Sequence, residues 1–453
     1  MGHKQMKKSF SFWIPAKKNK VHVTKLKPFR KQATFQRCLR VTLIIGQLFS
    51  LIPVKGVSSN SSADVRFTFK SWKCLYALLS LLLQIFMTVT CLHKLFSSVT
   101  SLNATTPVIF YGTTCLTMLM FFKVARAWPG LVHHISKNED LDPNFDGKLA
   151  YKCNITCGIV LLLALLEHIL SLLSAFAGAM VCQANKSFYE GFVTHFYPWV
   201  FTLMPYSAVL GALTQFIHFQ STFIWNFSDL FVICMSYYLT SRLQHINEKL
   251  LAAQGKYLPE IFWKTTREDY CRVTQLVRRV DEVISGIVFI SFANNLFFIC
   301  LQLFNTLEDG IKGNGQCSSR SKVTHLLGGY EAATYFLFSL VYLISRSIAV
   351  SLIASQVNTA STVPAPVLYD VPSPVYCIEV QRFLDQVNGE NVALSGLQFF
   401  SVTRSLLLTV AGTIVTYELV MFQFTSSSPS STNSSVNTLP NITTTMISST
   451  AMT

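Results

Sequence analysis

The stretch SLLLTVAGTIVTYELVMFQF at residues 405–424 decides the fold class of this chain. A helix of this length spans roughly 30 Å, enough to cross the hydrocarbon core of a bilayer. It contains one charged side chain, Glu418, together with a series of residues spaced four and three apart, which share one helix face: Thr409, Thr413, Thr416, Val420 and Gln423. We call this face the polar seam. It has two interpretations, hydrogen bonding to neighbouring helices or the wetted lining of a pore.

The composition of the whole chain points to a membrane protein. Of its 453 residues, 51% are hydrophobic and only 13% are charged, whereas soluble domains contain about 25% charged residues. Several apolar runs of about twenty residues predict an all-α, polytopic membrane protein. The net charge of +15 is spread among the loops rather than clustered, so we expect no nucleic-acid partner.

Seven transmembrane helices are predicted, with an organisation in three parts. Residues 1–73 form a basic cytoplasmic segment, in which the apolar stretch 41–54 is too short to span and is expected at the membrane interface. Residues 74–424 form the membrane domain. The tail 425–453 is rich in Ser and Thr and is expected to be disordered and extracellular. The predicted spans are 74–95, 108–124, 155–181, 216–239, 283–303, 330–352 and 405–424.

Charge sets the expected orientation. Residues 1–40 contain twelve Lys or Arg and no Asp or Glu, which holds this end inside the cell. This segment is also expected to be attracted to anionic membrane lipid. Seven spans then place the C-terminus outside, an inverted topology relative to rhodopsin-type receptors. The polar segments 125–152, 241–282 and 353–404 become cytoplasmic. The aromatic segment 192–212, interrupted by two prolines, is either an interfacial cap or the start of the fourth span.

The outer loops of this topology contain candidate modification sites. Four glycosylation sequons fall outside, at Asn103, Asn185, Asn433 and Asn441. Cys182 and Cys317 are the only cysteines expected in outer loops, where a disulfide between them and two separate thiols are both open. The sequence lacks the GxSxG, HExxH and phosphate-loop motifs, and it has no cluster of metal ligands. We therefore expect neither an enzyme nor a cofactor.

The end of the last predicted span resembles a known signature. Residues 416–424, TYELVMFQF, are similar to the TYhhhhhQF motif of insect gustatory receptors, where h is hydrophobic. The glutamate in TYE is similar to the sugar-sensing, or trehalose-receptor, branch. Further stretches resemble that branch, namely LFSLIPVKGV near residue 50, Leu166-Glu167-His168, and WNFSDL from Trp225 to Leu230.

This resemblance implies a function and an assembly. Such a receptor is a ligand-gated, non-selective cation channel, formed as a tetramer with itself or with other gustatory receptors. It lies in the plasma membrane of gustatory receptor neurons, binds a small sugar, and passes monovalent and divalent cations. The last helix lines the pore, which assigns pore roles to Thr416, Val420, Gln423 and Phe424. The Gln423 amide would replace part of an ion's hydration, while Val420 and Phe424 would form a hydrophobic constriction. Glu418, on another face, is expected to contact a neighbouring helix.

Polar groups inside the spans are the candidates for ligand binding, because they are costly in a membrane and face a cavity or a partner. A sugar site needs carboxylates or amides for hydroxyl groups and an aromatic ring for CH faces. Spacings of four residues pair Trp225 with Asp229 and Glu331 with Tyr335. The candidate residues are Trp225, Asp229, Glu331 and Tyr335, followed by Glu167 and His168. The alternative is that these groups only hold the helices together.

Two other classes of membrane protein also have about seven spans. A secondary transporter would show internal repeats with paired broken helices, and we find no such symmetry in the sequence. A G-protein-coupled receptor would have its C-terminus inside, opposite to the topology predicted here.

Overall fold

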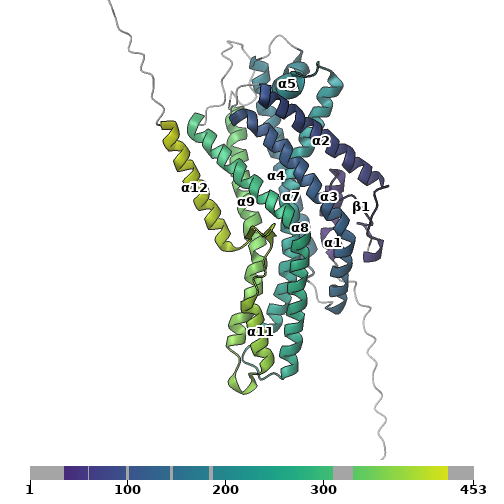
Figure 1. Cartoon of the computed structure of the whole chain (residues 1–453), viewed down its shortest axis with the longest axis vertical. Helices are drawn as coiled ribbons and strands as arrows, with labels where there is room; N and C mark the ends of the chain where they lie inside the picture. The colour runs from purple at the N-terminus through teal and green to yellow at the C-terminus, as the bar shows by residue number, and fades with distance from the viewer. Residues whose placement is uncertain are drawn as a thin grey trace, which may run out of the picture.

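The structure is a computed structural model that describes residues 35–59, 61–97, 102–142, 146–182, 187–309 and 330–426. This part of the chain is mostly helical and forms a long bundle (Figure 1). The helices are α1 (Phe35–Leu48), α2 (Trp72–Ser97), α3 (Leu102–Leu141), α4 (Leu149–Cys182), α5 (Phe188–Phe196), α6 (Pro198–Phe201), α7 (Ala208–Leu251), α8 (Glu260–Asp309), α9 (Glu331–Thr362), α10 (Pro364–Tyr369), α11 (Ile378–Gly389) and α12 (Arg404–Ser426).

Two short antiparallel hairpins and two 3₁₀ turns join these helices. Strand β1 (Val54–Lys55) pairs with β2 (Arg66–Phe67), with Val54 opposite Phe67. Strand β3 (Ser395–Gly396) pairs with β4 (Phe400–Ser401) immediately before α12. The turns are η1 (Ser62–Asp64) and η2 (Ser373–Val375). The second hairpin packs against α8 and so sets where α12 begins.

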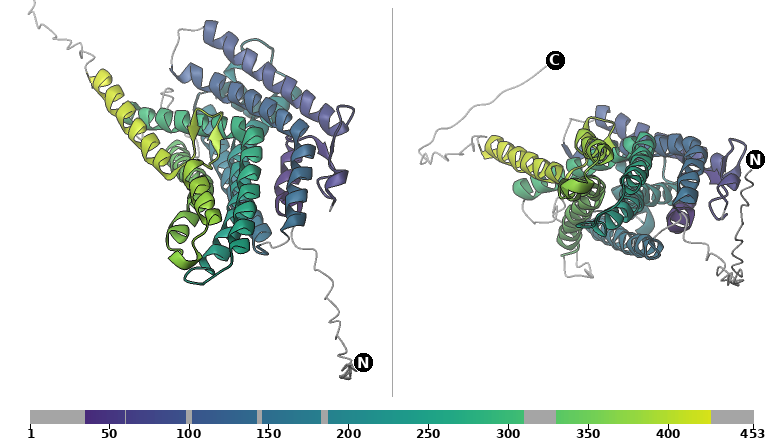
Figure 2. Two further views of the ribbon diagram at one scale, coloured as in Figure 1. Left: turned by 60° about the horizontal axis from the view of Figure 1, so that its bottom comes forward. Right: turned by 90° about the horizontal axis from the view of Figure 1, so that it is seen from below.

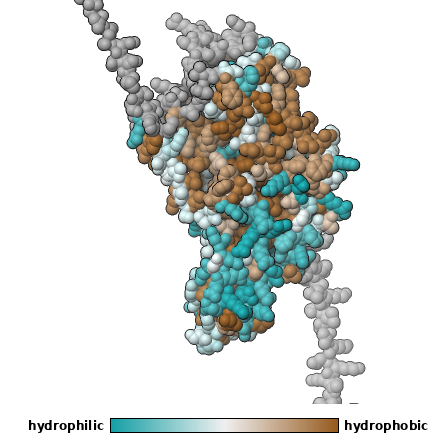
Figure 3. Space-filling view, in the orientation of Figure 1, coloured by the Kyte–Doolittle hydropathy of each residue, from teal (hydrophilic) through white to brown (hydrophobic). Residues whose placement is uncertain are grey.

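Five of the described helical segments are long and apolar enough to cross a membrane, which makes this a multi-pass membrane protein. Exposed aliphatic side chains cover α2 and α4 on the outside of the bundle. Figure 3 shows hydrophobic residues gathered over the upper part of the molecule, with hydrophilic residues over the end that holds α11. The five segments are Trp72–Ser97, Thr105–Leu141, Leu149–Met180, Glu260–Thr306 and Glu331–Tyr369.

Helix α7 occupies the centre of the bundle and contacts α3, α4, α8 and α9. It is buried along most of its length, and buried polar side chains such as Gln220, Asn226 and Asp229 interrupt its apolar residues. These groups face other helices rather than lipid. Helix α7, which contains the predicted span 216–239, is not among the five apolar segments, although its 44 residues exceed the length of a span.

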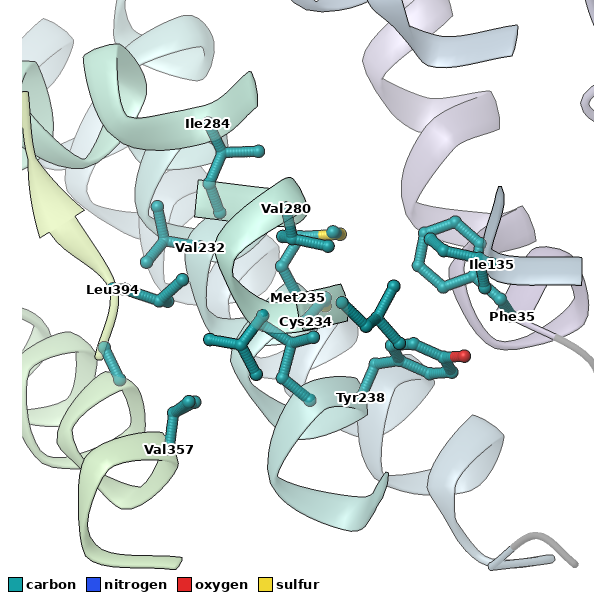
Figure 4. Close-up of a cluster of buried hydrophobic side chains, with 14 of the residues drawn as sticks. Phe35, Ile135, Val232, Cys234, Met235, Tyr238, Val280, Ile284, Val357 and Leu394 are labelled. Carbon is teal, nitrogen blue, oxygen red and sulfur yellow. The ribbon is translucent and has the colours of Figure 1, made fainter. Parts of the chain in front are cut away.

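The main hydrophobic core joins α1 to α3, α7, α8 and α9 (Figure 4). The rings of Phe35 and Tyr238 lie 4.8 Å apart, and Ile135, Val280 and Val357 are buried in the same cluster. Helix α1, which precedes the predicted membrane domain, is therefore part of the hydrophobic core. The stretch 41–54, which was expected at the membrane interface, runs from the middle of α1 to the first residue of β1. One face of α1 is buried and the other is exposed.

Several predicted loops are helical. Residues 125–141, predicted as part of a charged loop, continue α3, and α4 begins at Leu149. The segment 241–282, one of the polar segments expected in the cytoplasm, contains the end of α7 and the beginning of α8. The proline-rich segment 353–404 contains the end of α9, then α10, α11 and the second hairpin. The segment 192–212 contains the end of α5, then α6, and the start of α7.

Candidate functional site

A cavity of about 540 Å³ lies among α3, α4, α7, α8 and α9, with α5 and α6 along its edge. It is near the end of the bundle where α5 lies, opposite to α11 (Figure 1). This volume is within the usual range for small-molecule sites, roughly 300–1,000 Å³. The side chains that carry its chemistry are Tyr111, Glu167, His168, His195, Trp199, His218, Trp225, Phe298, Gln302, Tyr335 and Ser339.

The structure brings four of the six predicted ligand-binding residues to this cavity, namely Glu167, His168, Trp225 and Tyr335. Asp229 is one turn further along α7, fully buried beneath the cavity. Glu331 is buried in the first turn of α9, one turn before Tyr335, and does not line the cavity. The two spacings that suggested pairs therefore each place one residue in the cavity and one outside it.

One wall of the cavity is a chain of hydrogen bonds between three helices. The Ser339 hydroxyl on α9 donates to Oε1 of Glu167 on α4 at 2.6 Å. The Gln302 side chain on α8 donates from Nε2 to Ser339 Oγ at 3.1 Å. These two hydrogen bonds fix the orientation of the Glu167 carboxylate and of the Gln302 amide. The other Glu167 oxygen and the Gln302 oxygen therefore have defined positions at the cavity wall.

Three polar atoms at the cavity are buried without a hydrogen-bond partner in the part of the chain that the structure describes. They are the indole nitrogens Nε1 of Trp199 and Trp225 and the amide oxygen Oε1 of Gln302. A buried polar atom without a partner is costly, roughly 1–3 kcal/mol each. Two donors and one acceptor around one cavity are suited to a ligand that has several hydroxyl groups.

Aromatic rings and imidazoles form the rest of the lining. The rings of His168 on α4 and His218 on α7 lie 5.6 Å apart, and the Tyr111 hydroxyl is 3.1 Å from Nδ1 of His218. Trp225 packs on Phe298 with ring centroids 4.6 Å apart. These surfaces are wide enough to contact the CH faces of a sugar ring.

Several cavity residues were not predicted from the sequence, including His218, Trp199, Phe298 and Gln302. A signal for His218 was present, because His218 and Trp225 are seven residues apart and share a helix face. Trp199 was within the aromatic segment 192–212. The two α8 residues gave no such signal, since Phe and Gln are common in buried helices.

Beneath the cavity, Asp229 belongs to a buried polar network. Its Oδ2 is 2.8 Å from Nε of Arg346 on α9 and accepts a hydrogen bond of 3.1 Å from the Asn295 amide on α8. The Ser291 hydroxyl donates to its other oxygen. The contacts of Asp229 match the alternative interpretation of the sequence, in which a buried polar group holds helices together.

Helix α12 projects from the side of the bundle (Figures 1 and 2). Its polar seam is exposed at all five positions, from Thr409 to Gln423. The opposite face is partly buried, where Ile414 packs against the cluster of Phe298, Ile299 and Leu343. Glu418 lies on this inner face close to Cys300 of α8, as expected for a residue that contacts a neighbouring helix.

The threonine hydroxyls of the seam bond within α12. Thr409, Thr413 and Thr416 donate to carbonyl oxygens one turn earlier, at 3.2, 2.9 and 2.9 Å. Each hydroxyl oxygen keeps its acceptor capacity toward the outside of the helix. Phe424 is within α12, but its side chain lies outside the described part of the chain.

The predicted modification sites lie largely outside the described residues. Cys182 is the last residue of α4, and Cys317 is outside the described ranges, so their disulfide stays a prediction. Asn103 is in the first turn of α3, whereas Asn185, Asn433 and Asn441 are outside the described ranges, as is nearly all of the tail 425–453. Within the described ranges, no group of three or more His, Cys, Asp or Glu side chains is placed to hold a metal ion.

Comparison with solved structures relates this fold to insect olfactory receptors. The olfactory receptor OR5 from Machilis hrabei in complex with eugenol superimposes with a TM-score of 0.59, over 86% of this chain and 98% of that receptor, at 14% sequence identity. The same receptor without that ligand in its description gives a TM-score of 0.58. At this identity the similarity establishes the fold alone.

Sequence comparison gives the family. The chain is 33% identical to the gustatory receptor for sugar taste 64f of Drosophila melanogaster, over 87% of this chain and 82% of that receptor. It is 32% identical to the gustatory receptor 5a for trehalose of the same organism, over 88% and 87%. The model of the trehalose receptor family matches residues 5–433. This chain therefore belongs to the trehalose receptor family, whose Drosophila members include sugar gustatory receptors.

Proposed function

We propose that this protein is a sugar taste receptor in which a small sugar, bound in the cavity among α3, α4, α7, α8 and α9, opens a cation pore lined by α12. The observation that carries the proposal is the set of unpartnered polar atoms at that cavity, on Trp199, Trp225 and Gln302. Aromatic surfaces flank these atoms. A ligand with hydroxyl groups and CH faces would satisfy both features at once.

The exposure of the polar seam supports the pore. One copy of α12 cannot enclose a channel, so the proposal requires several copies, a tetramer of this chain with itself or with related receptors. The seam, with Thr416, Val420 and Gln423, would then face a shared axis, with Phe424 at its outer end. Threonine oxygens and the Gln423 amide would replace part of the hydration of monovalent and divalent cations without binding them tightly.

The packing of α12 supports a connection between the cavity and the pore. Phe298 lines the cavity and also belongs to the cluster against which Ile414 packs. A ligand that moves Phe298 therefore changes the surface that supports α12. Because packed clusters shift between discrete arrangements rather than deforming continuously, this contact is suited to a gate with two states.

The distribution of polar residues supports one orientation in the membrane. The end of the bundle with α11 and the long charged ends of α7 and α8 is hydrophilic (Figure 3), and we place it in the cytoplasm. The cavity lies toward the other end, so a sugar would enter from outside the cell. This placement agrees with a cytoplasmic basic N-terminus.

Binding of sugars to the purified protein tests the ligand. The melting temperature is measured in lipid nanodiscs with trehalose, sucrose, maltose or glucose, and with glycerol as a hydroxyl-rich control. A sugar that binds the folded state raises the melting temperature as its concentration increases, and the substitution Gln302→Ala should weaken this rise. If all four sugars have no more effect than glycerol, the proposed ligand class is wrong.

A further inference from the structure

Arg346 and Asp229 form an ion pair inside the membrane-spanning part of the bundle. The side chains are 3% and 0% exposed, and Nε of Arg346 lies 2.8 Å from Oδ2 of Asp229. Burying such a pair is costly, and well-packed apolar residues of similar size are often as stable. Holding the helices together therefore does not require these charges, which raises the question of what else the pair positions.

The guanidinium of Arg346 contacts groups on every side. One terminal nitrogen donates to the Asn226 side chain on α7, and the other donates to Oδ1 of Asn295 on α8 at 3.3 Å. The Tyr342 hydroxyl donates to the same Asn226 oxygen at 2.9 Å. The direction of the guanidinium plane is therefore fixed by two asparagine side chains as well as by the charge of Asp229.

This guanidinium lies over the indole ring of Trp225. Its central carbon is 4.7 Å from the ring centroid, within the range of a cation–π contact. Phe298 packs on the same indole, with ring centroids 4.6 Å apart. Trp225 lines the cavity, and its Nε1 is one of the unpartnered donors there, whereas Arg346 does not line the cavity.

We propose that Arg346 is a positioning residue that holds the Trp225 indole in place as the floor of the ligand cavity, so that the Arg346–Asp229 pair sets sugar affinity without touching the sugar. The inference rests on the proposed function and adds to it a residue that determines affinity. A cation beneath the ring fixes the ring plane, and the ring plane fixes where the Nε1 donor points. Asp229 and the two asparagines in turn fix the cation.

Lysine cannot replace arginine in this role, although it preserves the charge. An ammonium group is a compact point charge, and it cannot reach Asp229, Asn226 and Asn295 together while lying flat on an indole. The substitution Arg346→Lys should therefore leave a folded protein with a loosely held Trp225. A purely structural role would affect folding instead and would be independent of Trp225.

A double-mutant cycle on sugar-evoked currents tests this inference. The single substitutions Arg346→Lys and Trp225→Phe and their combination are expressed in cells, and currents are recorded with trehalose and with sucrose. We expect Arg346→Lys to raise the half-maximal concentration about tenfold, as loss of a desolvated cation–π contact would. The maximal current per surface receptor should be unchanged. In the Trp225→Phe background, Arg346→Lys should add little, because it acts through the indole.

Arg242→Lys is the matched control. Arg242 is also 3% exposed and lies 3.1 Å from an aspartate, Asp142, but this pair is at the far end of α7 from the cavity. Its substitution should leave the half-maximal concentration unchanged. If Arg346→Lys also leaves it unchanged, or if the effects of Arg346→Lys and Trp225→Phe multiply independently, the positioning role is wrong while the proposed function stands.

A measurement without any sugar separates the two proposals. The near-ultraviolet circular dichroism of Trp225 is obtained as the difference between wild-type protein and Trp225→Phe in nanodiscs. An indole held in one orientation gives a defined band, and Arg346→Lys should reduce this band, whereas Arg242→Lys should preserve it. A band that persists in Arg346→Lys contradicts the inference even if no tested sugar evokes a current, an outcome that would itself count against the proposed function.

Discussion

Ile414 of α12 packs against the hydrophobic cluster that contains Phe298 of α8, and Phe298 also lines the ligand cavity. The candidate pore helix and the candidate ligand site therefore both contact this cluster. A ligand that moved Phe298 would therefore alter the surface that supports α12.

Shortening Ile414 should weaken the link between the cavity and the pore. The substitution Ile414→Ala removes apolar contact with the Phe298 cluster, so the maximal sugar-evoked current should fall several-fold at equal surface expression. Sugar binding to the purified protein should be unchanged, because Ile414 does not line the cavity. Val415→Ala, at an adjacent position that is 59% exposed, is the control. Equal currents in both variants would contradict the link.

The unpartnered indole nitrogen of Trp199 should contribute to sugar binding. Trp199→Phe keeps an aromatic ring and removes the Nε1 donor, which should weaken affinity by about 1 kcal/mol, or roughly fivefold, if a sugar hydroxyl is its partner. Trp263 is a matched control, since its Nε1 is also buried without a partner in the described part of the chain but does not line the cavity. An unchanged dissociation constant in Trp199→Phe would remove this residue from the site.

The six candidate ligand-binding residues show how much of the candidate site can be predicted from the sequence. Intramembrane polarity correctly singled out the part of the chain around the cavity, because such groups must face a partner or a ligand. It did not separate the two cases. Asp229 and Trp225 lie on the same face of α7. Only the tertiary structure reveals that Arg346 pairs with the Asp229 carboxylate and lies over the Trp225 indole. Arg346 was a signal for this pairing in the sequence, because a cation within the predicted span 330–352 requires a buried anion.

Five of the seven predicted spans coincide with described segments that are long and apolar enough to cross a membrane, and these segments are longer than the predicted spans. The predicted spans 216–239 and 405–424 lie within α7 and α12, which are not among those five. Hydropathy marks where a helix is in lipid, but it gives no reason for a helix to stop where charged residues begin. Helix α3 therefore continues to Leu141, and α7 and α8 extend far beyond the apolar windows. The attachment of α1 was invisible for a different reason, because its partners in α7 are almost two hundred residues away.

The attachment of α1 can be tested with two glycines. A Cβ atom at Gly46 would lie 2.5 Å from the buried ring of Phe227, whereas a Cβ at Gly158 in α4 would meet nothing within 4 Å. Gly46→Ala should destabilise the protein by roughly 1–3 kcal/mol through overpacking. Gly158→Ala should be neutral or stabilising by up to about 1 kcal/mol. The melting temperatures in detergent measure both effects, and equal values would separate α1 from the packed body.

The contact between α8 and α11 should depend on pH. Oε2 of Glu379 is 2.9 Å from Nε of Arg267, and its Oε1 accepts a hydrogen bond of 2.9 Å from Arg382. These bonds, that from Arg267 foremost, hold the pKa of Glu379 below its usual value. Its stabilising contribution is therefore fully present above the unfolded pKa of roughly 4.3 and is lost as the pH falls through the lower, folded pKa.

Glu379→Gln tests this dependence. At pH 7 the variant should melt below the wild type, and the difference should shrink as the pH is lowered below about 4. Glu282→Gln is the control, because its partner Arg279 and Glu282 itself are both 59% exposed and such pairs contribute little. A melting difference for Glu379→Gln that is constant from pH 7 to pH 3 would show that the loss is not electrostatic.

Whole-cell recording with ion substitution is the most direct test of whether a sugar opens a cation pore lined by α12. Cells that express this chain, alone or with a related receptor, are exposed to trehalose, sucrose, maltose and glucose while sodium, potassium and calcium are exchanged outside. We predict a sugar-evoked cation current whose ion selectivity changes in Gln423→Ala, at equal surface expression, and stays the same in Leu408→Ala, at another exposed position of α12. Uptake of labelled sugar without current, or a current that requires a G protein and is indifferent to Gln423→Ala, would contradict this prediction.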